Sequence, residues 1–474
     1  MSENIDVCFS YIQRSFTDCA DFNSRRIDYS DGKVAYFINI GSYTDRDYVS
    51  ESMLLPLLRS AHSPKDKRAF SRAISCSELS EVPDADTAIL KLLSGFAIIL
   101  TQFEKGFGIF SCQVKLVASR SVSEPDSEVV IRGPREGFIE SSEDNLALLR
   151  KRLKTTSFKS VRLTSGTLTK TTIYLCYIDK IAKEETVNRV KKQIESIQMT
   201  GIIDSGYIEH YLQKSRPSLF PNAGSSEKPD VVTAKLLEGR VCIICDGSPA
   251  VLTVPFLFIE SLQSAEDYLK TPIYATFMRF LRFISAIISL YLPAVYLSTV
   301  EHHTSVLPYE LYKAVIKLRQ NVPFNVLGEL ITILFIFEII REVGIRMPKA
   351  VGNAVGIVAG IILGDAAISA NLASAPVIMV ASLSAVCTFI VPAFMNSIII
   401  VRFINLIFAQ LFGFPGVILS ACFITVCMAK KESFGIPYLM PFSPIKPKSL
   451  DDTLIVLPKK ALTPTTNSLY EEEK

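Results

Sequence analysis

The sequence predicts a cytoplasmic N-terminal region of two α/β subdomains followed by an α-helical polytopic membrane domain with five or six spans. Three observations lead to this fold class. The mean hydropathy of +0.31 is high for a soluble protein, and the apolar residues concentrate in residues 276–430. Residues 322–372 look like a membrane hairpin that retains several charges. The N-terminus lacks the basic segment and apolar core of a cleaved signal, so we expect the first half to stay in the cytoplasm.

Short apolar runs alternate with amphipathic stretches throughout the first half, which is typical of mixed helices and strands. Residues 34–40, 96–100, 113–119 and 128–132 read as strands of a first subdomain, and residues 48–59 as one of its helices. Residues 145–154 and 182–198 read as helices of a second subdomain, and residues 170–177 and 239–249 as its strands. We therefore divide the chain into residues 1–140, 141–255, a linker 256–275, the membrane domain 276–430 and a cytoplasmic tail 431–474.

The membrane domain contains six apolar segments, at 277–300, 322–341, 351–371, 373–395, 398–412 and 414–429. A span needs about 20 residues, so the last two, separated by a Gly/Pro turn, count either as two crossings or as one interrupted unit. Basic residues gather near 279–282, 341–349 and 430–431, and six crossings place all of them and both termini inside. The polar helix expected at 301–320 then lies on the outer surface. The proline-rich tail from 431 onward is expected to be extended or disordered.

The first arm of the hairpin carries Glu329 and Glu338 within apolar sequence. A charge at that depth is costly and normally faces a partner helix or a water-filled path. Glu338, Arg341 and Glu342 stand at i, i+3 and i+4, which predicts one cluster on one helical face. These three residues are candidates for a pore or gating role, and we favour a structural cluster that couples the soluble region to the spans.

For Glu329 two interpretations stay open, a buried structural pair or a lining of an ion path. Because Arg402 is the only basic residue at comparable depth in the neighbouring spans, few partners are expected, which favours the path.

The second arm places glycines at strict four-residue spacing, with Asp365 beside them; the stripe consists of Gly352, Gly356, Gly360 and Gly364. A stripe without side chains lets another helix approach closely. We expect it to pack helices or subunits together. Asp365, like Glu329, is a candidate for a pore-lining or gating carboxylate.

Several function classes find little support. With 50 basic and 47 acidic residues, the chain is too evenly charged to indicate nucleic-acid binding. Cys242 and Cys245 lie on a strand, no second cysteine pair follows at zinc spacing, and packed thiols are the expectation. The sequence has no phosphate-binding loop, nucleophile elbow or metalloprotease motif. We therefore expect no metal, no cofactor and no enzymatic activity.

The ordered series of motifs resembles the A subunits of the GerA-type spore germinant receptors over most of the chain after residue 125. The strongest block runs from Val322-Pro323-Phe324 to Gly352 and includes the charges of the hairpin. The other matching residues are Arg132 to Phe138, Asn145, Arg150, Arg152, Pro221, Lys228 to Asp230, Gly239-Arg240, Asp246 to Pro249, Asp267-Tyr268, Arg279, Arg282, Pro293, Ser433 to Gly435 and Pro437-Tyr438.

The resemblance implies a multi-pass protein of the spore inner membrane that oligomerises and releases monovalent cations when a nutrient is sensed. It also implies a transporter-like B subunit and a lipoprotein C subunit as partners, besides membrane lipids. One departure concerns the pore: the family more often has Gln at the position of Asp365 and an acidic residue at that of Ser369. Alternatives are the related stage V sporulation protein AF, a membrane transporter, and an enzyme with a membrane anchor.

Overall fold

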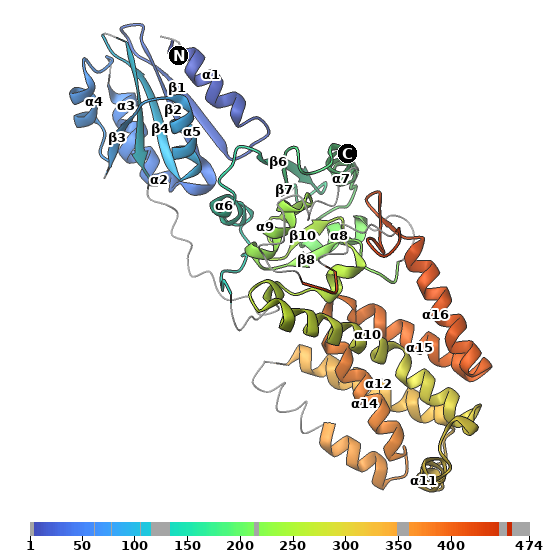
Figure 1. The fold of residues 1–474 in the computed structure, drawn as a ribbon. Coiled ribbons are helices and arrows are strands. Elements are labelled where there is room, and N and C mark those ends of the chain that lie inside the picture. Colours follow the sequence, from blue (N-terminus) through green and yellow to red (C-terminus); the bar gives the residue numbers. More distant parts are fainter. Residues whose placement is uncertain are drawn as a thin grey trace. The chain divides into compact units, whose positions relative to one another are not determined.

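The computed structural model describes residues 4–60, 62–76, 78–104, 106–114, 133–212, 218–347, 360–444 and 453–456. The chain divides into two compact units (Figure 1). The first comprises Met1–Lys214, Asn222–Pro255 and Asn467–Lys474, and the second comprises Ser215–Pro221 and Phe256–Thr466. The first unit contains two five-stranded sheets, and the second is helical.

The first sheet has the strand order β1-β2-β4-β5-β3, and all its neighbouring strands are antiparallel. Its strands are β1 (Phe22–Asp28), β2 (Val34–Ile40), β3 (Leu79–Val82), β4 (Phe96–Gln102) and β5 (Phe107–Gln113). The helical elements are α1 (Ile5–Ser15), η1 (Gly41–Tyr43), α2 (Arg46–Val49), η2 (Ser50–Leu54), α3 (Leu55–Arg59), α4 (Lys67–Ala73) and α5 (Ala85–Leu93).

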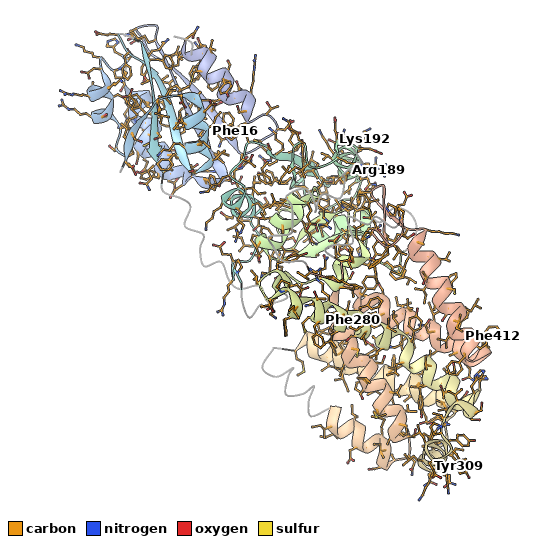
Figure 2. All side chains as sticks on the ribbon, in the orientation of Figure 1. Phe16, Arg189, Lys192, Phe280, Tyr309 and Phe412 are labelled. Carbon is orange, nitrogen blue, oxygen red and sulfur yellow. The ribbon has the colours of Figure 1, made fainter. Side chains whose placement is uncertain are left out.

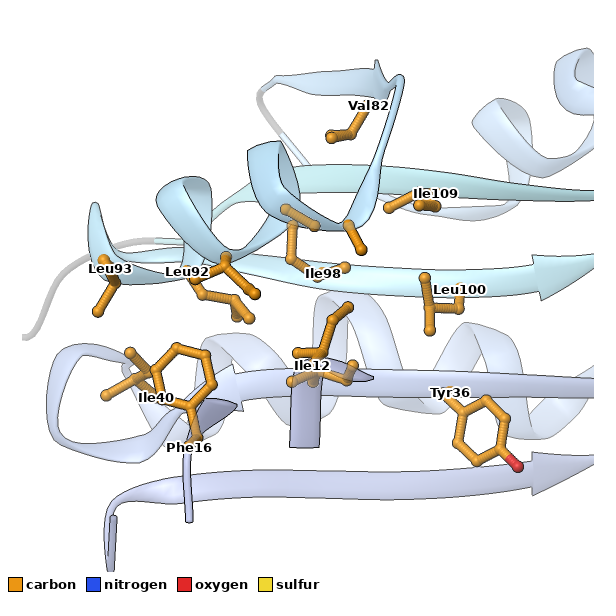
Figure 3. Packing of buried hydrophobic residues seen from close by; sticks show 14 of the residues in the cluster. Ile12, Phe16, Tyr36, Ile40, Val82, Leu92, Leu93, Ile98, Leu100 and Ile109 are labelled. Atoms are coloured by element: carbon orange, nitrogen blue, oxygen red, sulfur yellow. The ribbon is translucent and has the colours of Figure 1, made fainter. Parts of the chain in front are cut away.

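Helices cover both faces of this sheet. Tyr36, Ile38 and Ile40 of β2 face α1 and α5, as Figure 3 shows for the cluster around Ile12 and Leu92. The alternate residues of β2 pack with α4 on the opposite face. Because successive side chains of a strand point to opposite faces, β2 and β4 must be apolar at nearly every position. This explains why both strands are recognisable in the sequence as continuous apolar runs.

The second sheet has the order β6-β7-β9-β10-β8 and is also antiparallel. Its strands are β6 (Phe158–Ser165), β7 (Thr171–Ile178), β8 (Gly224–Ser226), β9 (Val241–Cys245) and β10 (Val251–Val254), and its helices are α6 (Ser142–Arg152), α7 (Glu184–Glu195), α8 (Ser205–Leu212) and α9 (Pro229–Leu237). Numbered from its own first strand, this order is the same as that of the first sheet. The N-terminal unit therefore repeats one topology, which the sequence did not reveal.

A buried ion pair joins the two sheets. Arg150 of α6 is fully buried, and its Nε and Nη2 atoms lie 2.7 and 2.8 Å from the carboxylate of Asp21, just before β1. Ser42 and Ser160 also donate hydrogen bonds to that carboxylate. The charge of Arg150 is thereby neutralised inside the unit.

The helical unit begins with η3 (Phe258–Leu262) and η4 (Ala265–Tyr268). Its helices are α10 (Pro272–Glu301), η5 (Thr304–Val306), α11 (Tyr309–Arg319), α12 (Val326–Arg346), α14 (Ala375–Phe389), η6 (Pro392–Phe394), α15 (Met395–Phe412) and α16 (Phe414–Ala429). Residues Gly360–Ser369 form a further apolar helix. Around an apolar core that includes Leu330 and Val377, α10 contacts α12, α14 and α15.

Two of the described helical segments, Pro272–Glu301 and Pro392–Phe412, are long and apolar enough to cross a membrane. The segments Gly360–Ser369, Ala375–Phe389 and Phe414–Ala429 are apolar but shorter. The expected helical nature of the C-terminal region is thus confirmed, while the number of spans stays a prediction. Helix α11 lies in the stretch 301–320 that was expected to be helical.

The tail was expected to be largely extended or disordered; residues 431–444, however, are folded, while most of the tail lies outside the described residues. Strands β11 (Glu432–Ser433) and β12 (Ile436–Pro437) form a small hairpin, and Tyr438 is fully buried. Farther along, Thr453 accepts a hydrogen bond from Arg279, and the Val456 amide donates one to Thr276. The tail therefore contributes to the packing of α10.

Residues 1–255, expressed alone, are expected to be soluble and to unfold cooperatively. Arg150→Ala should lower the free energy of unfolding of this fragment by about 3–5 kcal/mol, because Asp21 is left buried without its partner. Denaturant titration measures the change. The neighbouring Lys151, a surface residue paired with Glu136, is the matched control, and its replacement should cost less than about 1 kcal/mol. Equal effects of the two substitutions would contradict the assignment.

Candidate functional site

A polar assembly inside the helix bundle is built around Arg402 of α15. Its side chain is 1% exposed, and its Nη2 atom lies 2.7 Å from Oε1 of Glu338 on α12. The second carboxylate oxygen of Glu338 pairs with Arg341 at 2.8 Å, one helical turn away. Two guanidinium groups thus share one carboxylate.

Hydroxyl groups extend this assembly through the bundle. Arg402 donates to Oγ of Ser384 at 3.2 Å, and Ser384 donates to the carbonyl oxygen of Ser289 on α10 at 2.9 Å. The hydroxyls of Ser289 and Thr388 lie 2.6 Å apart. Since Ser384 and Thr388 are four residues apart, they lie on the same face of α14. The result is a polar seam that connects α10, α12, α14 and α15 within apolar surroundings.

Glu329 lies in a second buried assembly, at the start of α12. Asn325 accepts a hydrogen bond from the Gly328 amide and caps the helix, which places Glu329 in its first turn. Glu329 is fully buried. Its Oε1 lies 3.0 Å from Arg319 of α11, and its Oε2 accepts hydrogen bonds from the amide and hydroxyl of Ser374 at 2.9 and 2.8 Å. The carboxylate therefore caps the positive N-terminal end of α14 from a neighbouring helix.

This geometry corrects the expectation that Glu329 would have few partners. The cation comes from Arg319, which is only ten residues earlier but belongs to the polar helix α11. An ion path was favoured because few basic partners were expected for Glu329, and this reason no longer holds. In the structure Glu329 links α11 and α14 to α12.

The expected cluster of three charges is divided in the structure. Glu338 and Arg341 belong to the Arg402 assembly, whereas Glu342 pairs with Arg346 one turn further along, and both of these side chains are more than half exposed. The i, i+3, i+4 spacing correctly placed Glu338 beside Arg341, but no local pattern indicated that Arg402 would draw Glu338 into the bundle.

Asp365 differs from both glutamates. It lies in the helix Gly360–Ser369, is exposed, and forms no ion pair or hydrogen bond with any residue that the structure describes. Its neighbours Ile361 and Ile362 are 68% and 59% exposed, although Ala367 is buried in the core. A Cβ atom placed on Gly360 or Gly364 would meet nothing within 4 Å. Gly352 and Gly356 lie outside the described residues.

A third charged assembly lies at the beginning of α10 and was not singled out as a site. Asp267 of η4 is almost completely buried; Arg279 reaches it at 3.2 Å, and Arg282 reaches it at 2.7 and 2.9 Å. The two arginines are one turn apart, and the sequence indicated them as an orientation signal and as residues that match the family. An Asp twelve residues before two arginines at i, i+3 is the signal that could have indicated this assembly.

Lys431, just after α16, binds a segment that is remote in sequence. Its ammonium lies 2.8 Å from Oγ of Ser218 and 3.2 Å from the Pro221 carbonyl, and also contacts the carbonyl of Phe220. Burial lowers the pKa of Lys431 to about 8, so the group is charged at neutral pH and loses its charge above that value. Residues 218–221 are thereby held within the helical unit.

The Glu338–Arg402 pair provides a test of these assemblies. Glu338→Leu alone should destabilise the full-length protein in detergent by about 3–5 kcal/mol, because Arg402 is left buried without its partner, whereas Arg402→Leu should cost less, because Glu338 keeps its pair with Arg341. The double variant should recover much of this loss, because Arg341 is 20% exposed and can extend towards water. Thermal unfolding of the four proteins gives the coupling energy. Additive losses would show that the pair is not coupled.

Within the part of the chain that the structure describes, no three His, Cys, Asp or Glu side chains form a group that could hold a metal ion. Cys242 and Cys245 are fully buried in β9, where Cys242 pairs across the sheet with Cys176. The packed-thiol interpretation agrees with this position.

Comparisons with known proteins extend over nearly the whole chain. Uncharacterized membrane protein YfkQ from Bacillus subtilis is 33% identical over 94% of this chain and 87% of its own length. Spore germination protein KA from the same organism is 33% identical over 92% of this chain and 81% of its own, and spore germination protein B1 is 35% identical over 91% and 90%.

Among solved structures, the N-terminal domain of the A subunit of the Bacillus megaterium spore germinant receptor GerK3 matches with a TM-score of 0.42 and 24% identity. The match covers 54% of this chain and 97% of that domain. A sequence model of the family described as Bacillus/Clostridium GerA spore germination protein matches residues 10–467. The chain belongs to this GerA family of spore germination proteins.

Proposed function

We propose that this protein is the A subunit of a nutrient germinant receptor in the inner membrane of spores, where several copies assemble around a gated cation path. Family membership and the two membrane-length helical segments support a membrane receptor subunit. A transporter-like B subunit and a lipoprotein C subunit would complete the receptor. The N-terminal unit would lie in the cytoplasm.

The observation that carries the channel proposal is the contrast between Asp365 and the two glutamates. Glu329 and Glu338 are neutralised by arginines of their own chain. Asp365 stands on an apolar, largely exposed helix without a described partner. An ionised carboxylate facing lipid is costly, so such a residue belongs in a water-filled path or against another subunit. A ring of these carboxylates, one from each copy, would attract cations.

In this proposal the buried ion pairs hold together the helices that form the gate of the cation path. Opening requires helices to shift, and the Arg402 and Glu329 assemblies each connect helices that would have to move together. Helix positions in which a buried ion pair is broken are costly, whereas positions in which the pair is formed again are not. Such assemblies therefore favour a few discrete arrangements of the helices.

Asp365→Asn should reduce the release of monovalent cations from germinant-treated spores by roughly tenfold, the equivalent of about 1.4 kcal/mol in the barrier to ion passage. The amide keeps the size of the side chain, so protein abundance should not change. Glu342→Gln is the matched control, because its carboxylate is exposed and paired on the surface of α12. Normal cation release at normal abundance in Asp365→Asn would rule out the ring.

Gly360→Leu should weaken assembly without harming the fold of the single chain, since a Cβ atom there meets nothing within 4 Å. Gly344→Leu is the matched control, because this glycine of α12 has equally open surroundings. Native mass measurement in detergent separates the oligomers. An unchanged oligomer in Gly360→Leu would contradict packing through the glycine stripe.

A further inference from the structure

Helix α11 exposes apolar side chains along most of its length. Tyr309, Leu311, Ile316 and Leu318 are 71%, 51%, 41% and 55% exposed, while Val315 is buried against the bundle. Figure 2 labels Tyr309 on this helix. Exposed apolar side chains concentrated on one short helix indicate an interaction site.

Two lysines accompany these apolar residues. Lys313 and Lys317 are one turn apart and exposed, and neither forms an ion pair with a described residue. At 100° per residue both point away from Val315. Arg319, the third cation of the helix, is already used by Glu329. The outward surface of α11 also carries the exposed Glu310, so its two lysines leave a net charge of +1 beside the flanking Leu, Ile and Tyr side chains.

The chain fixes where this surface lies within the helical unit. Helix α10, which is long enough to cross a membrane, ends at Glu301, and α12 begins at Val326. Glu301 also accepts a hydrogen bond from the Val326 amide, so the two ends lie together. The segment 302–325, which contains α11, consequently projects from one end of the bundle. If the bundle is embedded in a membrane, as proposed above, this end lies at the boundary between lipid and water.

We infer that α11 is an interfacial helix that binds the surface of the bilayer, with its Leu, Ile and Tyr side chains among the acyl chains and Lys313 and Lys317 against anionic phospholipid headgroups. A bilayer fits better than a protein partner, because the apolar residues flank the lysines on both sides instead of forming one closed patch. Tyr at the ends of spans and Lys on an amphipathic helix are typical of this boundary. The inference depends on the proposed membrane location.

The chain contains no tryptophan, so a single introduced tryptophan reports on one site. Three full-length variants in vesicles are compared: Leu318→Trp on α11, Ile287→Trp midway along α10, and Leu168→Trp in an exposed turn of the N-terminal unit. Lipids brominated near the headgroup or near the chain end quench tryptophan fluorescence at the corresponding depth. We expect shallow quenching in the Leu318→Trp variant, deep quenching in Ile287→Trp and none in Leu168→Trp.

The controls separate the two proposals. If the Ile287→Trp variant were quenched and the Leu318→Trp variant were not, the bundle would be inserted and the inference on α11 would be wrong. Protection of the Leu318→Trp fluorescence from aqueous iodide would then show that a protein surface covers the helix. If neither variant were quenched, the proposed membrane location itself would fail. Quenching of Leu318→Trp only by the deep bromines would place α11 inside the hydrocarbon and would also overturn an interfacial position.

The charge component has its own test. In the Leu318→Trp background, quenching by shallow bromines should be stronger in vesicles containing phosphatidylglycerol than in pure phosphatidylcholine. Lys313→Gln with Lys317→Gln should abolish this difference. The matched control, Arg189→Gln with Lys192→Gln, removes the same charge from α7 of the N-terminal unit and should preserve it (Figure 2). A difference that survives the α11 substitutions would exclude headgroup pairing by these lysines.

Discussion

The helical unit depends on the neutralisation of its buried charges by groups of the same chain. Arg402 has Glu338, Glu329 has Arg319, and Asp267 has two arginines. An uncompensated charge in such a place costs several kcal/mol, so these pairings restrict which helices can be neighbours. They also make the apolar packing specific, since a rotated helix would bury the same surface but would separate its charges.

Sequence periodicity was sufficient to predict the limits of the helices and strands whose burial is uniform. Strand β2 was predicted at its observed limits because both of its faces are covered, and β7 and α7 were placed within a few residues. Strand β1 was missed because it is an edge strand with four consecutive exposed residues, FNSRRID, and no apolar alternation. The sequence did not reveal the repeated strand order of the two sheets. Strand order depends on hydrogen bonds between backbones, and these place few constraints on the residue types.

The sequence predicted the residues of the candidate site, but not the residues with which they form ion pairs and hydrogen bonds. Charges inside apolar segments are conspicuous, so Glu329, Glu338 and Asp365 could be singled out from composition alone. Which of them is satisfied depends on contacts between helices, and neither Arg319 nor the hydroxyls of Ser374 and Ser384 is distinctive by itself. Only the three-dimensional arrangement separates the two carboxylates that are paired with arginines from Asp365, which has no described partner.

The attachment of residues 218–221 by Lys431 changes how the two units are tethered. The chain passes from the first unit to the second before residue 218, returns at Asn222, and leaves again at Phe256. The contacts of Lys431 keep residues 218–221 with the helices, so this short segment is a second point, besides Phe256, at which the chain enters the helical unit.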